Sequence, residues 1–143
     1  MEKICDAYAK EAGISGGVAS LRRFSTPMKL RPGAADAAKQ TQPGRYQEAA
    51  PKHVGRLLWA VRGSRPDVAA AVLRLGRRVS RGWSVVQDEA MQRLYCYLYH
   101  TRDLGLWLVF SPGALSIVGF SDADHANDPE NTCLLYTSPS PRD

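Results

Sequence analysis

The chain has 143 residues, of which 44% are hydrophobic and 23% are charged, with a formal net charge of +5. This length and balance predict one soluble domain of ordinary size. Charge throughout the first 13 residues excludes a secretory signal, and the longest apolar runs are too short to span a bilayer. Cysteines without metal-ligand spacing, namely Cys5, Cys96 and Cys133, predict reduced thiols in an intracellular protein.

The first 28 residues predict a helix followed by a short extended segment. Apolar residues recur at near-helical spacing between Ile4 and Ile14, and the glycines that follow end this helix. We expect Val18–Phe24 to be extended, up to a Ser-Thr-Pro sequence that stops it. Residues 29–51 are rich in Ala, Gln, Gly and Pro with little to bury, which predicts a flexible linker.

Residues 52–104 predict three amphipathic helices. The second covers Pro66–Val79, and Ser64 is placed to cap its first turn. The third opens with a capping box, Ser84-Val85-Val86-Gln87, and ends near His100. Because helices joined by short connections pack on one another, a three-helix block is expected here.

The pattern then changes from helix to strand. Gly105–Phe110 is rich in strand formers, a Ser-Pro-Gly turn follows, and Leu115–Phe120 is a second apolar run. This sequence predicts a β-hairpin. The expected fold class is α+β, mainly helical, with the hairpin after the three-helix block.

The positive charge is concentrated in the helical block. Between His53 and Gly82 there are seven arginines and one acidic residue, Asp67. Guanidinium groups bind phosphates in a bidentate manner, and counterion release drives their association with nucleic acid. The alternative is a solvated basic helix face. The candidate nucleic-acid contacts are Arg56, Arg62, Arg74, Arg77, Arg78 and Arg81.

Other polar and aromatic residues of the block are expected to be structural. Aromatic rings beside arginines suit base stacking, but at helical spacing they more often form a core, with Trp83 and Tyr99 as the expected exceptions. His53 is expected to have a structural role, and Cys96 to be a buried, inert thiol. Asp67 should interact with the positive end of its helix.

Two acidic residues, Asp122 and Asp124, end the second apolar run. Residues two apart on a strand point to the same face, and a carboxylate pair there suits Mg²⁺ in phosphodiester chemistry. The alternative is a solvated turn at a strand end. A two-metal site needs further carboxylates, which the short remainder of the chain does not supply.

The last eleven residues, 133–143, have the sequence CLLYTSPSPRD. This string resembles the translation of a transposase mosaic end followed by the adapter of a tagmentation sequencing library. We therefore expect Thr132 to be the last residue of natural coding sequence, and we exclude the tail from fold reasoning.

Five groups of motifs follow one another between residues 2 and 132. They are Ser25-Thr26-Pro27-Met28; Tyr46 with Val54-Gly55-Arg56-Leu57-Leu58-Trp59; Arg65-Pro66-Asp67-Val68; Leu94-Tyr95-Cys96-Tyr97-Leu98 with Asp103-Leu104-Gly105-Leu106; and Gly119-Phe120-Ser121-Asp122-Ala123-Asp124. In this order and spacing they resemble the copia-type retrotransposon polyproteins, from the end of reverse transcriptase to the start of RNase H. His125 and Asn127 depart from the family pattern, which usually has Trp and Gly there.

The resemblance implies a division of the chain. Residues 1–28 would end the reverse transcriptase region, 29–51 would be the linker, 52–104 a thumb and connection block, and 105–132 the truncated start of RNase H. The hairpin would begin an RNase H-like sheet. Asp122 would be a catalytic carboxylate that binds Mg²⁺, with Asp124 as a second metal contact.

The resemblance also implies a function. The parent would perform RNA-directed DNA synthesis and degrade the RNA of an RNA–DNA hybrid, in a cytoplasmic particle or the nucleus. The fragment lacks the polymerase Tyr-x-Asp-Asp motif and most RNase H carboxylates, so it is expected to be inactive and to hold no Mg²⁺ tightly. Its expected partners are a hybrid or duplex, bound through phosphates, and the adjoining palm and RNase H segments, with no membrane. The alternative is a non-catalytic nucleic-acid-binding module from a decayed element.

Overall fold

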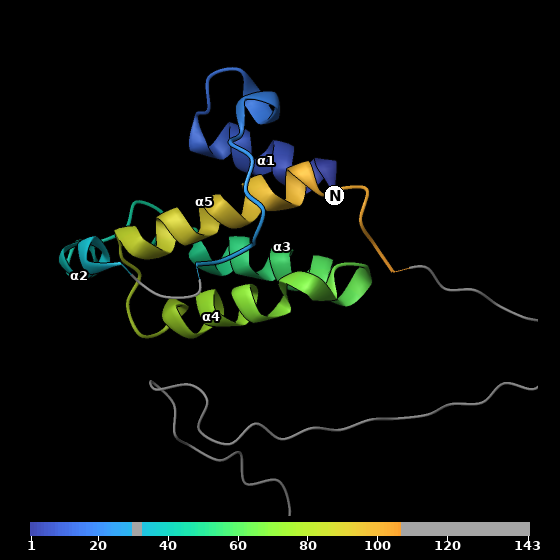
Figure 1. Cartoon of the computed structure of the whole chain (residues 1–143). Coiled ribbons are helices and arrows are strands. Elements are labelled where there is room, and N and C mark those ends of the chain that lie inside the picture. Colours follow the sequence, from blue (N-terminus) through green and yellow to red (C-terminus); the bar gives the residue numbers. More distant parts are fainter. Residues whose placement is uncertain (30–32, 107–143) are drawn as a thin grey trace, which may run out of the picture. The chain divides into compact units, whose positions relative to one another are not determined.

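Helices predominate in the part of the chain that the computed structural model describes, residues 1–29 and 33–106 (Figure 1). The mainly helical character predicted from the sequence is confirmed for these residues. The predicted β-hairpin and the tail 133–143 lie outside them. In chain order the elements are α1 (Glu2–Ala12), the 3₁₀ turn η1 (Gly17–Ser20), α2 (Ala34–Gln40), α3 (Ala50–Gly63), the 3₁₀ turn η2 (Pro66–Val68), α4 (Ala69–Val79) and α5 (Val85–His100).

The N-terminal helix forms as predicted and ends at a glycine. Gly13 adopts a left-handed conformation with φ of 65°, a backbone state that glycine enters without steric cost. The expected extended segment at Val18–Phe24 is wrong in its first half, because η1 covers Gly17–Ser20. The Ser20 hydroxyl donates to the carbonyl oxygens of Ser15 and Gly17, at 3.0 and 2.9 Å, and these local bonds favour a turn.

Part of the segment 29–51, which was expected to be a flexible linker, forms α2, and this helix contacts α5. Its Ala-rich sequence has high helix propensity, and Lys39 forms an ion pair with Glu89 of α5. Further on, the backbone N–H of Gly44 donates to the carbonyl oxygen of Trp83 at 3.0 Å. A Cβ at Gly44 would lie 2.6 Å from the Trp83 ring, so this close approach requires glycine.

The second predicted helix is divided into η2 and α4, and Ser64 does not cap it. The buried Arg65 organises this turn instead. Its Nε and Nη2 donate to the two carboxylate oxygens of Asp67 at 2.8 and 2.7 Å, and its Nη1 donates to the Thr101 carbonyl oxygen at 2.7 Å. Asp67 therefore binds Arg65, and Arg65 is in turn bonded to Thr101 at the end of α5. This ion pair, and not the expected interaction with the helix dipole, is the main contact of Asp67.

Helix α5 is central to the described unit: it contacts α1, α2 and α4, while α3 packs along α4 (Figure 1). The predicted capping box is confirmed, since the Ser84 hydroxyl accepts from Val86 N–H at 3.3 Å and Gln87 Oε1 accepts from Ser84 N–H at 2.9 Å. The expected packing of the three helices is confirmed as well. Core side chains that are fully buried come from α1, α3, α4 and α5: Cys5, Tyr8, Leu57, Val72, Met91, Leu94, Tyr95 and Leu98.

The Arg65 contacts generate a stability prediction. Replacing Arg65 by Ala removes charge-assisted hydrogen bonds and leaves the Thr101 carbonyl without its donor, so the free energy of unfolding should fall by about 2–3 kcal/mol. Urea denaturation followed by circular dichroism measures this change. The matched control Arg62→Ala removes an exposed arginine three residues earlier and should stay within about 0.5 kcal/mol of the parent chain. Equal effects of the two substitutions would contradict the assigned role of Arg65.

Candidate nucleic-acid interface

Four of the six predicted phosphate-binding arginines lie in one stripe on α4 and the turn that follows it. Arg74, Arg77 and Arg78 lie on α4 at i, i+3 and i+4, a spacing at which side chains share a helix face, and Arg81 lies in the turn after the helix. The buried residues of α4 are Ala71, Val72 and Leu75. No acidic residue occurs between Asp67 and Asp88. We call this set the arginine stripe: Arg74, Arg77, Arg78 and Arg81, of which only Arg78 is half-buried.

The two remaining candidates lie on α3, outside the arginine stripe. Arg56 Nη1 donates to Glu11 Oε1 at 3.1 Å, and Lys52 donates to the same oxygen at 2.8 Å. Hydrogen bonds from these two cations, Lys52 first, hold the pKa of the Glu11 carboxyl below its usual value. Arg62 is exposed in the last turn of α3, where a cation meets the negative end of the helix dipole.

Arg65 does not belong to the interface at all. Its side chain is 1% exposed, and its hydrogen bonds with Asp67, the largest cause, raise the pKa of the guanidinium. The sequence run of seven arginines is therefore divided by the fold into a stripe, two α3 cations and one buried structural residue. Sequence spacing on α4 was sufficient to predict the stripe, but not the removal of Arg65.

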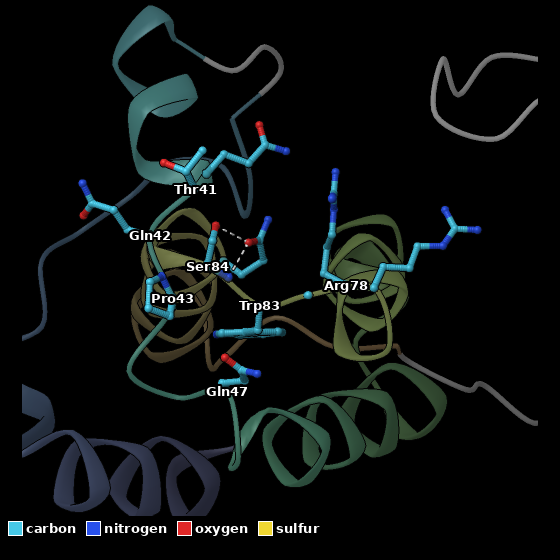
Figure 2. Close-up of a pocket in the computed structure, with 11 residues that line it drawn as sticks. Thr41, Gln42, Pro43, Gln47, Arg78, Trp83 and Ser84 are labelled. Atoms are coloured by element: carbon cyan, nitrogen blue, oxygen red, sulfur yellow. Dashed lines mark hydrogen bonds between the residues drawn. The ribbon is translucent and has the colours of Figure 1, made fainter.

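A polar cavity of about 250 Å³ lies beside one end of the arginine stripe (Figure 2). Thr41 and Gln42, at the end of α2, lie across it from Arg78 of α4, and Trp83 and Ser84 lie between them. The sequence did not indicate this cavity, because five of its eleven lining residues belong to the segment predicted to be a linker. The capping box at Ser84 predicted where α5 starts, but it did not indicate which segments lie beside that start.

The aromatic side chains that are buried and those that are exposed differ from the prediction. Trp83, an expected exception to the core, is 3% exposed, and its Nε1 donates to Asp88 Oδ1 at 2.6 Å, so it cannot stack on a base. Trp59, expected in the core, is 77% exposed on α3. Tyr99, the other expected exception, is half-buried. Trp107 lies outside the described residues.

His53 has a packing role, as the sequence predicted. Its Nδ1 lies 3.1 Å from the Tyr95 hydroxyl, and its Nε2 lies 3.1 Å from Glu11 Oε2 without hydrogen-bond geometry. The ring is fully buried and edge-on to Tyr8 and Tyr95, which stack on each other at 4.1 Å. Burial lowers the pKa of His53, so neutral imidazole is favoured. A side chain enclosed in this way has no access to a substrate.

The thiols of the described part are equally unsuited to chemistry. Cys5 and Cys96 are free and buried. Burial raises the pKa of Cys5 to about 11 and also raises that of Cys96. Since the thiolate is the nucleophilic form, both behave as small apolar core residues. The prediction of a buried, inert Cys96 is confirmed.

The predicted metal ligands Asp122 and Asp124 lie outside the described residues. Within residues 1–29 and 33–106, no group of three or more His, Cys, Asp or Glu side chains is placed to hold a metal ion. No helix in that part is long and apolar enough to cross a membrane. Comparison of the chain with protein families, curated proteins and solved structures finds no match.

The buried histidine predicts a pH dependence of stability. Its pKa in the folded chain is below the unfolded value of about 6.5, so the unfolded chain binds the extra proton as the pH falls below 6.5. The free energy of unfolding should therefore fall from pH 7.5 towards pH 5, and this window lies above the titration of Glu11. Urea denaturation at each pH measures the slope. His53→Gln should flatten it, and an unchanged slope in this variant would contradict the prediction.

Proposed function

We propose that the helical unit is a nucleic-acid-binding module that grips a phosphate backbone through the arginine stripe. The observation that carries this proposal is the grouping of three arginines on α4 and a fourth in the turn after it, in a stretch without acidic residues. From Arg74 to Arg78 the helix rises about 6 Å, which is the rise of about two nucleotides along one strand of a duplex. The stripe therefore matches a short run of phosphates in length as well as in charge.

The resemblance to copia-type polyproteins supports the same proposal. In such a parent, the helical block would be the thumb and connection region that holds an RNA–DNA hybrid or duplex between the polymerase and RNase H segments. The parent would synthesise DNA on RNA and degrade the RNA strand. Mg²⁺ held by Asp122, with Asp124, would supply the water-activating charge for that second reaction. For this chain we propose binding without catalysis.

A second candidate, also compatible with the exposed arginines, is a solvated surface with no ligand. The two differ in their dependence on salt. Four neutralised phosphates predict a slope of log affinity against log salt of about −3 to −4, which is a loss of about a hundredfold between 50 and 200 mM salt. A solvated surface gives no measurable binding and hence no slope.

The stripe gives a direct mutational prediction. Arg74→Ala and Arg81→Ala, at its two ends, should each weaken duplex binding at any base sequence and reduce the salt slope by about 1. Fluorescence anisotropy of a labelled duplex at several salt concentrations measures both quantities. Lys3→Ala is the matched control, because it removes one exposed cation from α1. If the control lowers the slope as much as the stripe variants do, net charge alone drives binding and the stripe has no special role.

The absence of catalysis is tested separately. With Mg²⁺ and a labelled RNA–DNA hybrid, the chain should release no more RNA product than Asp122→Asn, because two metal ions need more carboxylates than this segment supplies. Gel analysis of the RNA strand over time gives the rate. Mg²⁺-dependent cleavage that Asp122→Asn abolishes would show that the segment is a working nuclease.

A further inference from the structure

Trp59 is the most exposed large apolar side chain in the described part of the chain, at 77%. The buried side of α3 carries Val54, Leu57 and Ala60, and Trp59 lies on the opposite, solvent side. A large aromatic ring left in water on a regular helix has no role in packing the core. An exposed apolar group of this size is informative about a ligand or a partner.

Two glycines leave the indole of Trp59 uncovered. Gly55 and Gly63 lie four residues before and four residues after it on the same helix face, where side chains would otherwise contact the ring. A Cβ added to either glycine would meet nothing within 4 Å, so close packing does not require glycine at these positions. Glycine also weakens a helix relative to alanine. The bare surface on both sides of Trp59 therefore has no explanation in the fold itself.

Cations surround the same ring. Arg56 and Arg62 lie three residues before and three residues after Trp59, and α3 has no acidic residue. Arg56 and Lys52 share the single carboxylate of Glu11, so this pair keeps an excess positive charge. Arg62 adds another exposed cation. The face combines an open aromatic surface with phosphate-binding groups on both sides.

We propose that Trp59 is a stacking platform for an unpaired base, with the neighbouring phosphates held by Arg62 and by the Lys52–Arg56 pair. This inference rests on the proposed nucleic-acid binding and adds a preference for single strands to it. In a duplex the bases are already stacked on one another and cannot reach the indole, whereas every unpaired base offers a free face. The cationic flanks favour this ligand over a second copy of the chain, which carries the same net positive charge.

The test compares two ligands and three variants of the full chain. Anisotropy is measured with a labelled oligo(dT) twelve-mer and with a duplex of equal length, both at low salt. Trp59→Ala should weaken single-strand binding about tenfold or more and change duplex binding less than twofold. Trp59→Phe should restore most of the affinity, because a phenyl ring also stacks. Leu73→Ala, which removes another exposed apolar side chain, should change neither affinity.

Fluorescence adds a readout that a merely structural role would not affect. A base stacked on an indole should quench Trp59 emission when the oligonucleotide binds, whereas the buried Trp83 should be unaffected. The quench should therefore disappear in Trp59→Phe although binding persists. Persistence of the full quench in that variant would exclude Trp59 as the contact.

The outcomes separate this inference from the proposed function. If the stripe variants lower the salt slope but Trp59→Ala leaves single-strand affinity unchanged, the module binds nucleic acid and the stacking role is wrong. An equal loss for duplex and single strand would also overturn it, because that pattern indicates a general effect on folding. Absence of binding to both ligands refutes both proposals. Sedimentation showing a dimer that Trp59→Ala dissociates would assign the ring to self-association instead.

Discussion

The enclosure of α5 by its neighbours is the constraint on which the rest of the described structure depends. Met91, Leu94, Tyr95 and Leu98 are fully buried, so α5 needs apolar cover from several sides, and α1 and α4 each supply part of it. Its first turn also fixes the chain before α3, because Asp88 accepts hydrogen bonds from the backbone of Arg45 and Tyr46 and from the Trp83 indole. Once α5 is covered in this way, the outer faces of α3 and α4 remain for a ligand.

The same arrangement distributes charge unevenly. Glu11, Asp67 and Asp88 are each engaged by donors within the fold: Lys52 and Arg56 at Glu11, a buried guanidinium at Asp67, and backbone N–H groups at Asp88. Helix α4 has no acidic residue of its own. Internal acids therefore stabilise turns and helix contacts, whereas α4 contributes arginines and no acid. This division favours a polyanion as the ligand.

The two proposed surfaces come from adjacent helices and recognise different parts of one ligand. The arginine stripe would bind phosphates, which are present in single and double strands alike. It would therefore provide affinity without selectivity between the two forms. Trp59 would stack on the face of a base, which is free only in an unpaired strand. A module at the junction between a polymerase and a nuclease would meet both forms, and this combination of contacts would hold either one.

The sequence by itself determined what is local: the helix ended by Gly13, the capping box at Ser84, the amphipathic helices and the arginine stripe. Each depends on residues within one or two turns, where spacing fixes geometry. Only the tertiary structure decided that residues 29–51 contain a docked helix, that Arg65 is buried, and that Trp83 is covered while Trp59 is exposed. These outcomes depend on partners such as Glu89, Thr101 and Gly44, which are distant in sequence. A propensity or a periodicity cannot identify such partners, because burial is a property of the assembled helices and not of any one of them.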